Sequence, residues 1–177
     1  MKKIILLFIL VSGFSFGQVE NFSVENHKIF WEKVYETNDT PEVIESKIKQ
    51  FGYFYDIEKV DGKLVMKFKD VKPLYREAGQ SVGYASMYIS SGVFFGAALI
   101  EFKENKYRVT VSNVKSIFEY LSITMNDSKT TITLEDPGLT RSGEFKSGFV
   151  KRDAKVLNYT FNEMFDISKY KSKTDNW

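Results

Sequence analysis

The sequence predicts an α+β fold, in which an antiparallel β-sheet carries two helices packed on one face in the order β-α-β-β-β-β-α with an extra hairpin. Three observations predict it. Short polar turn signals join neighbouring strand-like runs, a helix-start signal follows the first strand, and an apolar stripe at helical spacing lies near the end of the chain. With 177 residues, 43% of them hydrophobic, the chain is long enough to bury one core.

The first predicted strand and helix lie in the first third of the chain. Residues 26–36 (NHKIFWEKVYE) are rich in β-branched and aromatic side chains, which predicts a strand. Thr40 is then a suitable helix cap, Pro41 fits the first helical position, and Gly52 supplies the stop. The apolar residues of this helix predict one buried stripe: Val43, Ile44, Ile48 and Phe51.

Three hairpins follow this helix. Each joins two runs in which apolar and polar residues alternate, so that one side of each run faces the core. The predicted pairs are residues 53–60 with 63–69 around Asp61-Gly62, 93–102 with 106–114 around Glu104-Asn105, and 120–125 with 130–134 around Asn126-Asp127. In the second hairpin, Gly96, Ala97 and Ala98 leave room for a helix to lie close.

The last predicted helix begins at Asp153, which we expect to be its N-cap. Apolar residues then recur at i, i+4, i+5, i+8 and i+9 and predict a second buried stripe: Val156, Leu157, Phe161, Met164 and Phe165. Because no linker or repeat divides residues 18–177, we expect one α+β domain, with a charged and frayed tail after about residue 169.

The first seventeen residues have the pattern of a secretory signal peptide. Two lysines follow the first methionine, an apolar run covers residues 4–11, and small side chains stand at Ser15 and Gly17. This pattern predicts cleavage between Gly17 and Gln18 and a periplasmic or secreted protein. The apolar run is too short for a helix to cross ~30 Å of hydrocarbon, and we expect no transmembrane span in the mature chain.

Removal of this leader changes the charge of the chain. The 25 Lys+Arg and 23 Asp+Glu give a net charge of +2, but two of the bases and none of the acids lie in the leader. The mature domain is therefore formally neutral, and we expect no nucleic-acid partner held by a general positive field. The absence of cysteine excludes a disulfide framework and a Cys nucleophile, and the single histidine excludes multi-His zinc sites.

Three stretches carry a family resemblance. They are the strand-to-helix passage IFWEKVYETNDTPEVIESKI, the hairpin GVFFGAALIEFKENKYRVTVSNV and the aromatic C-terminal helix. Together they resemble a family of exported bacterial domains of unknown function with a TATA-box-binding-protein-like (TBP-like) fold. The resemblance covers most of residues 24–168, although residues 119–150 depart from the family's compact pattern. The resemblance implies the order of helices and strands along the chain that is given above. It implies no catalytic residues and no established ligand.

Candidate catalytic groups are few. His27 begins the first strand beside two glutamates, where a general base could be oriented by a carboxylate, but no nucleophile motif accompanies it, and we interpret it as an exposed histidine. Asp56, Glu58 and Asp61 lack the spacing of a calcium loop and are interpreted as solvated hairpin charges. The sequence therefore predicts no catalytic residue, no cofactor and no metal site.

A candidate ligand or partner surface lies in the uncharged stretch of residues 78–100. If the loop of residues 72–91 covers a gap between sheet and helix, its aromatic and methionine side chains would line an apolar pocket or a contact surface. The alternative is that they complete the core. The residues concerned are Tyr84, Met87, Tyr88, Phe94 and Phe95.

Together these features favour an exported, non-enzymatic binding or interaction domain, whose partner could be a protein or a small apolar ligand. One alternative is a small carrier of an apolar ligand or lipid, and a more remote one is a hydrolase built from carboxylates brought together by folding. The environment of Tyr84, Tyr88 and Phe95 distinguishes the first two. Exposure indicates a partner, a cavity indicates a ligand, and a filled core indicates neither.

Overall fold

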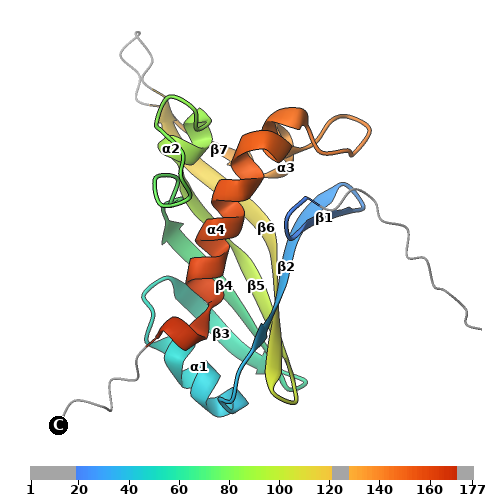
Figure 1. Cartoon of the computed structure of the whole chain (residues 1–177), viewed down its shortest axis with the longest axis vertical. Helices are drawn as coiled ribbons and strands as arrows, with labels where there is room; N and C mark the ends of the chain where they lie inside the picture. Colours follow the sequence, from blue (N-terminus) through green and yellow to red (C-terminus); the bar gives the residue numbers. More distant parts are fainter. Residues whose placement is uncertain (1–18, 121–127, 171–177) are drawn as a thin grey trace, which may run out of the picture.

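The computed structural model describes residues 19–120 and 128–170, which form an antiparallel sheet with helices on one face (Figure 1). The strands are β1 (Phe22–Glu25), β2 (Lys28–Glu36), β3 (Phe54–Val60), β4 (Lys63–Val71), β5 (Val93–Lys103), β6 (Lys106–Tyr120) and β7 (Ser128–Thr133). The helices are α1 (Pro41–Lys49), α2 (Met87–Ser90), α3 (Glu135–Gly138) and α4 (Ala154–Phe165). The strand order is β1-β2-β6-β5-β4-β3, with β7 paired to β6, and the predicted α+β class is confirmed.

The first predicted strand is confirmed over Lys28–Glu36 as β2, but it begins two residues later than predicted and pairs with a strand that was not predicted, β1. Asn26 and His27, expected inside the strand, have φ angles of 49° and 58° and form the turn between β1 and β2. Asparagine tolerates the left-handed conformation that such a turn requires. The prediction was wrong here because the strand-like pattern continues through a two-residue turn without a glycine.

Helix α1 begins as predicted. The Thr40 hydroxyl oxygen accepts a hydrogen bond from the Val43 backbone N–H at 3.4 Å, and Pro41 is the first helical residue. Ile44 and Ile48 are buried, whereas Val43 is exposed, so the buried stripe is narrower than predicted. The helix ends at Lys49, before Gly52, which does not adopt a left-handed conformation.

The first two predicted hairpins are confirmed. Asp61 and Gly62 have φ angles of 50° and 75° between β3 and β4, and Glu104-Asn105 joins β5 to β6. The predicted inward sides are buried: Leu64, Met66 and Phe68 on β4, and Tyr107, Val109 and Val111 on β6.

The predicted register of the third hairpin is wrong. Strand β6 itself continues to Tyr120, and its end pairs with β7, so that Phe118 lies opposite Thr130. A break at Asn113, whose φ is 52°, shifts the inward side of β6 to Val114, Ser116 and Phe118. The predicted turn at Asn126-Asp127 lies outside the described residues, as do the leader and residues 171–177.

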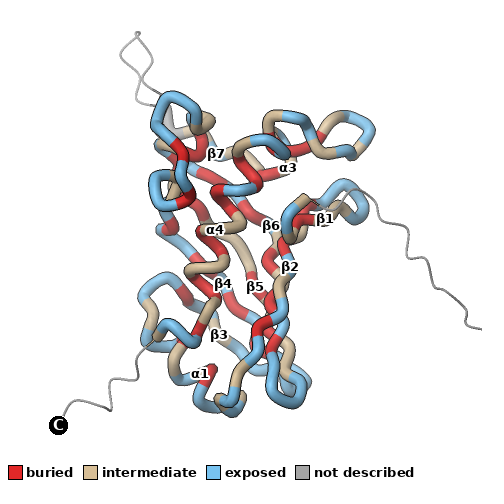
Figure 2. The backbone as a smooth tube through the Cα atoms, viewed as in Figure 1, coloured by how far each residue is buried: buried red, intermediate tan, exposed pale blue. Residues whose placement is uncertain are grey.

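Helix α4 covers the centre of the sheet, and its inward side is buried along its length (Figure 2). All five residues of the predicted stripe are buried: Val156, Leu157, Phe161, Met164 and Phe165. We expected α4 to lie directly on Gly96, but the ring of Phe68 lies over this glycine. A Cβ at Gly96 would come within 2.7 Å of the Phe68 ring. The Phe68 ring packs in turn against Phe161, with ring centroids 6.0 Å apart.

The chain end of the described part packs against α1 and α4. The Tyr170 hydroxyl donates a hydrogen bond to the Met164 carbonyl at 2.6 Å, and its ring centroid lies 3.8 Å from that of Phe51. Tyr170, which stands within the tail predicted to fray after about residue 169, is therefore bound to the domain.

Candidate functional site

The connection between β4 and β5 is hydrogen-bonded to α4 and to the turn that precedes it. The Leu74 backbone N–H donates to the Thr160 hydroxyl oxygen at 2.9 Å, and the Gln80 side-chain amide donates to the Arg152 carbonyl at 2.8 Å. These bonds link two segments that are far apart in the sequence and bury Gln80. The connection is thus fixed to the helix at two points before α2 begins.

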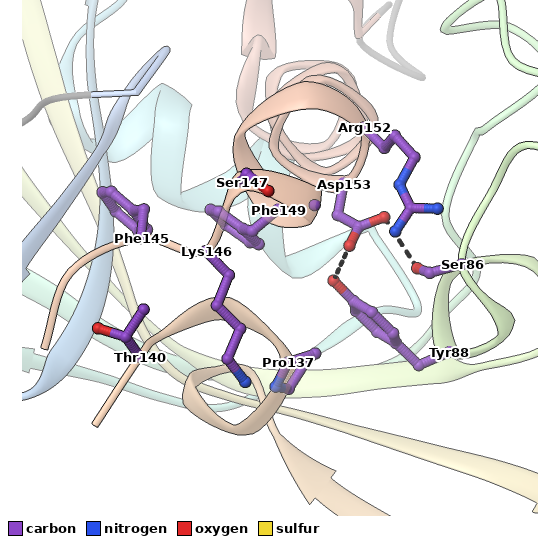
Figure 3. A pocket seen from close by; sticks show the side chains of 11 residues that line it. Ser86, Tyr88, Pro137, Thr140, Phe145, Lys146, Ser147, Phe149, Arg152 and Asp153 are labelled. Carbon is purple, nitrogen blue, oxygen red and sulfur yellow. Dashed lines mark hydrogen bonds between the residues drawn. The ribbon is translucent and has the colours of Figure 1, made fainter. Parts of the chain in front are cut away.

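A third anchor is a buried carboxylate, Asp153, which is 3% exposed. The Tyr88 hydroxyl donates to its Oδ2 at 2.7 Å and the Ser86 hydroxyl donates to its Oδ1 at 2.8 Å (Figure 3). Burying a charge is costly unless hydrogen bonds satisfy it, and here each oxygen has a donor. Burial and the neighbouring carboxylate raise the pKa of Tyr88 far above its ordinary value, so the hydroxyl stays protonated and able to donate.

Asp153 directly precedes the first residue of α4, as the sequence predicts, but it does not act as a cap. A π-helical turn, Phe149–Asp153, precedes α4, and Asp153 itself has helical angles, with φ −75° and ψ −38°. Its side chain makes no capping hydrogen bond, because both oxygens are engaged by the segment that includes α2.

The five residues of the predicted surface do not lie together. Tyr88 and Phe94 are buried, with ring centroids 6.2 Å apart, and belong to the core. Tyr84 and Met87 are 51% and 52% exposed. Phe95 is half-buried and follows Phe94 on β5, so it lies on the opposite face of the sheet. The structure thus separates an exposed pair from a core pair.

Sequence reasoning missed one member of the exposed group, Val82, which is 54% exposed. It stands two residues before Tyr84 in the same uncharged stretch, so its apolar character was visible in the sequence. Val82, Tyr84 and Met87 are hereafter called the apolar tip.

Sequence reasoning also missed a pocket beside Asp153, open to solvent and about 690 Å³ in volume. One wall is formed by Ser86 and Tyr88, and the other by the segment that leads from α3 into α4 (Figure 3). In that segment the rings of Phe145 and Phe149 stack with centroids 5.2 Å apart and an interplanar angle of 9°. Phe145 precedes the helical residues and forms an isolated bridge with Leu139, so no periodic signal in the sequence, where this region was interpreted as a polar loop, indicated its stacking on Phe149.

The remaining candidate groups are solvent-facing. His27 is exposed at the tip of the β1–β2 turn, and Asp56 forms an exposed ion pair with Lys67 at 2.9 Å. Within residues 19–120 and 128–170, no three metal-ligating side chains gather closely enough to hold an ion. No helix in the same ranges is both long and apolar enough to cross a membrane.

Comparison with known proteins concerns the fold. No protein-family model matches the chain, and no curated protein matches it significantly. A solved DUF4468 family protein from Bacteroides ovatus ATCC 8483 is similar in structure, with a TM-score of 0.51 and 9% identity over 85% of this chain and 89% of that chain. A TBP-like protein from Parabacteroides distasonis ATCC 8503 has a TM-score of 0.48 and 15% identity over 84% of this chain and 98% of that chain.

The chain thus shares the fold of the bacterial DUF4468 family protein. Neither description names an enzymatic activity or a ligand. At such low identity the likeness concerns the fold and carries no residue roles with it.

Proposed function

We propose that this chain is an exported, non-enzymatic binding domain that contacts a protein partner through its apolar tip. The observation that carries the proposal is the exposure of three large apolar side chains, Val82, Tyr84 and Met87, within six residues of the chain. Single exposed apolar residues are common, but a local group without charges is typical of a contact surface.

The anchoring of the tip supports this proposal. Ser86 and Tyr88, which flank Met87, are both hydrogen-bonded to the buried Asp153. A segment that is already ordered loses little conformational entropy when it binds, and this increases the affinity obtained from a small contact area. The uncharged tip also has no charged group of its own to desolvate.

The two alternative functions have less support. An apolar carrier was expected to gather five side chains around one cavity, but Phe94 lies in the core, Tyr84 and Met87 are exposed, and Tyr88 alone of the five lines the pocket beside Asp153. A carboxylate hydrolase needs a free carboxylate in a concave site, and Asp153, the buried carboxylate among residues 19–120 and 128–170, has both oxygens bound to hydroxyl donors.

The export part of the proposal rests on the leader pattern and is tested by its removal. We expect a chain lacking residues 2–17 to remain in the cytoplasm, and the intact chain to yield a mature protein whose first residue is Gln18. Cell fractionation and N-terminal mass spectrometry measure both. Export of the shortened chain, or retention of residues 1–17 in the exported protein, would contradict it.

The binding part is tested by site-specific cross-linking in the host. A photoreactive phenylalanine analogue in place of Tyr84 is expected to give one discrete protein adduct, because this exposed ring lies in the proposed contact. The matched control is the same analogue in place of Tyr55 on β3, which is 36% exposed. Adding Met87→Ser to the Tyr84 variant is expected to reduce the adduct. Identical adducts from both positions, or no effect of Met87→Ser, would overturn the proposal.

A further inference from the structure

The pocket beside Asp153 is lined by a cation, Arg152. The Arg152 side chain is half-buried and lines the pocket, yet its guanidinium makes no hydrogen bond or ion pair with any residue in the described ranges 19–120 and 128–170. Within the described residues Arg152 forms no ion pair with its neighbour Asp153, whose two carboxylate oxygens accept from Tyr88 and Ser86. Five N–H donors in a planar fork are thus available to an oxyanion.

A second cation, Lys146, lies in the wall formed by the segment between α3 and α4. Its ammonium donates one hydrogen bond, to the Asp136 carbonyl at 2.7 Å, which leaves two donors. Ser147 and Gly148 line the same pocket and belong to the first helical turn of residues 147–165, whose dipole adds positive potential.

The acidic side chains of this segment do not offset these cations within the pocket. Glu135 accepts from the Ile29 backbone N–H at 3.2 Å, and Asp136 accepts from the Thr133 backbone N–H at 2.8 Å. Glu144 is exposed and does not line the pocket. The charged residues that line the pocket are the two cations Arg152 and Lys146 and the one carboxylate Asp153, so the lining carries a net charge of +1 and favours an anion.

The rest of the wall is apolar. Pro137 and the half-buried Phe145 line the pocket beside the cations, and Phe145 is held in place by its stacking on Phe149. A volume of about 690 Å³ is in the range of pockets that bind small molecules. Cations next to a fixed aromatic ring match a molecule with a charged end and an apolar body.

We propose that this pocket binds a small oxyanion, a carboxylate or phosphate group joined to an apolar body, with Arg152 holding the charge, Lys146 adding positive potential from the opposite wall, and Phe145 and Pro137 contacting the body (Figure 3). The proposal is independent of the protein contact at the apolar tip, because it uses none of the same side chains.

Isothermal titration of the protein purified from its host tests the proposal with four probes: benzoate, phenyl phosphate, inorganic phosphate and benzyl alcohol. We expect saturable binding of benzoate or phenyl phosphate, weaker binding of inorganic phosphate, and none of the neutral alcohol. Arg152→Gln is expected to weaken binding about tenfold or more, because a charge-assisted hydrogen bond is lost. Lys155→Gln, an exposed α4 residue outside the pocket, is the matched control and should bind like the wild type.

Lys146→Gln provides a second variant, because this exposed side chain can be changed without disturbing the fold, and a severalfold loss of affinity is expected. Absence of saturable binding by all three anions, or equal affinities of Arg152→Gln and Lys155→Gln, would overturn the site. Equal affinities for inorganic phosphate and phenyl phosphate would contradict the proposed contact between the pocket and an apolar part of the ligand. None of these results would affect cross-linking through position 84, so failure of this site and failure of the proposed function remain distinguishable.

Discussion

A Phe161→Ala variant is expected to lose about 3–5 kcal/mol of its free energy of unfolding. Phe161 is fully buried. Its ring centroid lies 5.5 Å from that of Trp31, 6.0 Å from that of Phe68 and 6.3 Å from that of Phe22. These three residues come from β2, β4 and β1, so one side chain joins α4 to three strands. Truncation leaves a cavity between helix and sheet that rigid strands cannot close. Urea unfolding followed by tryptophan fluorescence measures the loss.

The matched control for this variant is Lys155→Ala on the same helix. Lys155 is exposed, and its substitution introduces alanine with no loss of buried surface, so we expect a change within about 0.5 kcal/mol. The comparison removes the contribution of helix propensity, which both substitutions share. Similar losses for the two variants would show that the contact between α4 and the sheet does not carry the stability of the fold.

Local turn chemistry explains which parts of the sheet were predictable. Asp61, Gly62 and Asn105 tolerate the positive φ angles of tight turns, and both hairpins turn at the predicted residues. The Asn26-His27 turn uses the same backbone conformation without glycine, so composition alone placed it inside a strand. The sequence was thus sufficient to locate a turn where it contains Asp-Gly or Glu-Asn between two strand-like runs.

The register of β7 could not be predicted because of a local backbone irregularity. Along β6, Tyr107, Val109 and Val111 face the core, and after Asn113 the inward set changes to even-numbered residues that include Val114 and Phe118. Strict alternation, applied from the start of the strand, therefore points the later residues to the wrong face. Strand β6 also continues to Tyr120, which the sequence had assigned to the first strand of the third hairpin.

The site depended on contacts that no local pattern contains. Asp153 has the sequence context of a helix cap, but its partners Ser86 and Tyr88 lie 67 and 65 positions away. Tyr84 and Tyr88 stand four residues apart in the same uncharged stretch, yet one is exposed and the other is buried against that carboxylate. Composition could identify the stretch as unusual, whereas only the path of the chain over α4 decides which side chains remain outside.

An Asp153→Ala variant is expected to lose about 3 kcal/mol of its free energy of unfolding and to loosen the segment around α2. The substitution removes two hydrogen bonds to a charged acceptor, each worth about 1.5–3 kcal/mol, while the desolvation cost of the buried carboxylate is also removed. It leaves the Tyr88 hydroxyl, in a side chain only 6% exposed, without its acceptor. Urea unfolding measures the stability, and amide hydrogen exchange of residues 86–91 measures the local opening.

Tyr88→Phe separates the two parts of this effect. It removes one of the two hydrogen bonds but keeps the ring that packs on Phe94, so we expect a loss of about 1–2 kcal/mol and little change in exchange around α2, because Ser86 still holds Asp153. In the double variant the two losses are expected to be less than additive, since both remove the same bond. Additive losses would show that the carboxylate and the hydroxyl act separately. Unchanged exchange in Asp153→Ala would show that the packing of Tyr88, rather than the buried charge, keeps the apolar tip in place.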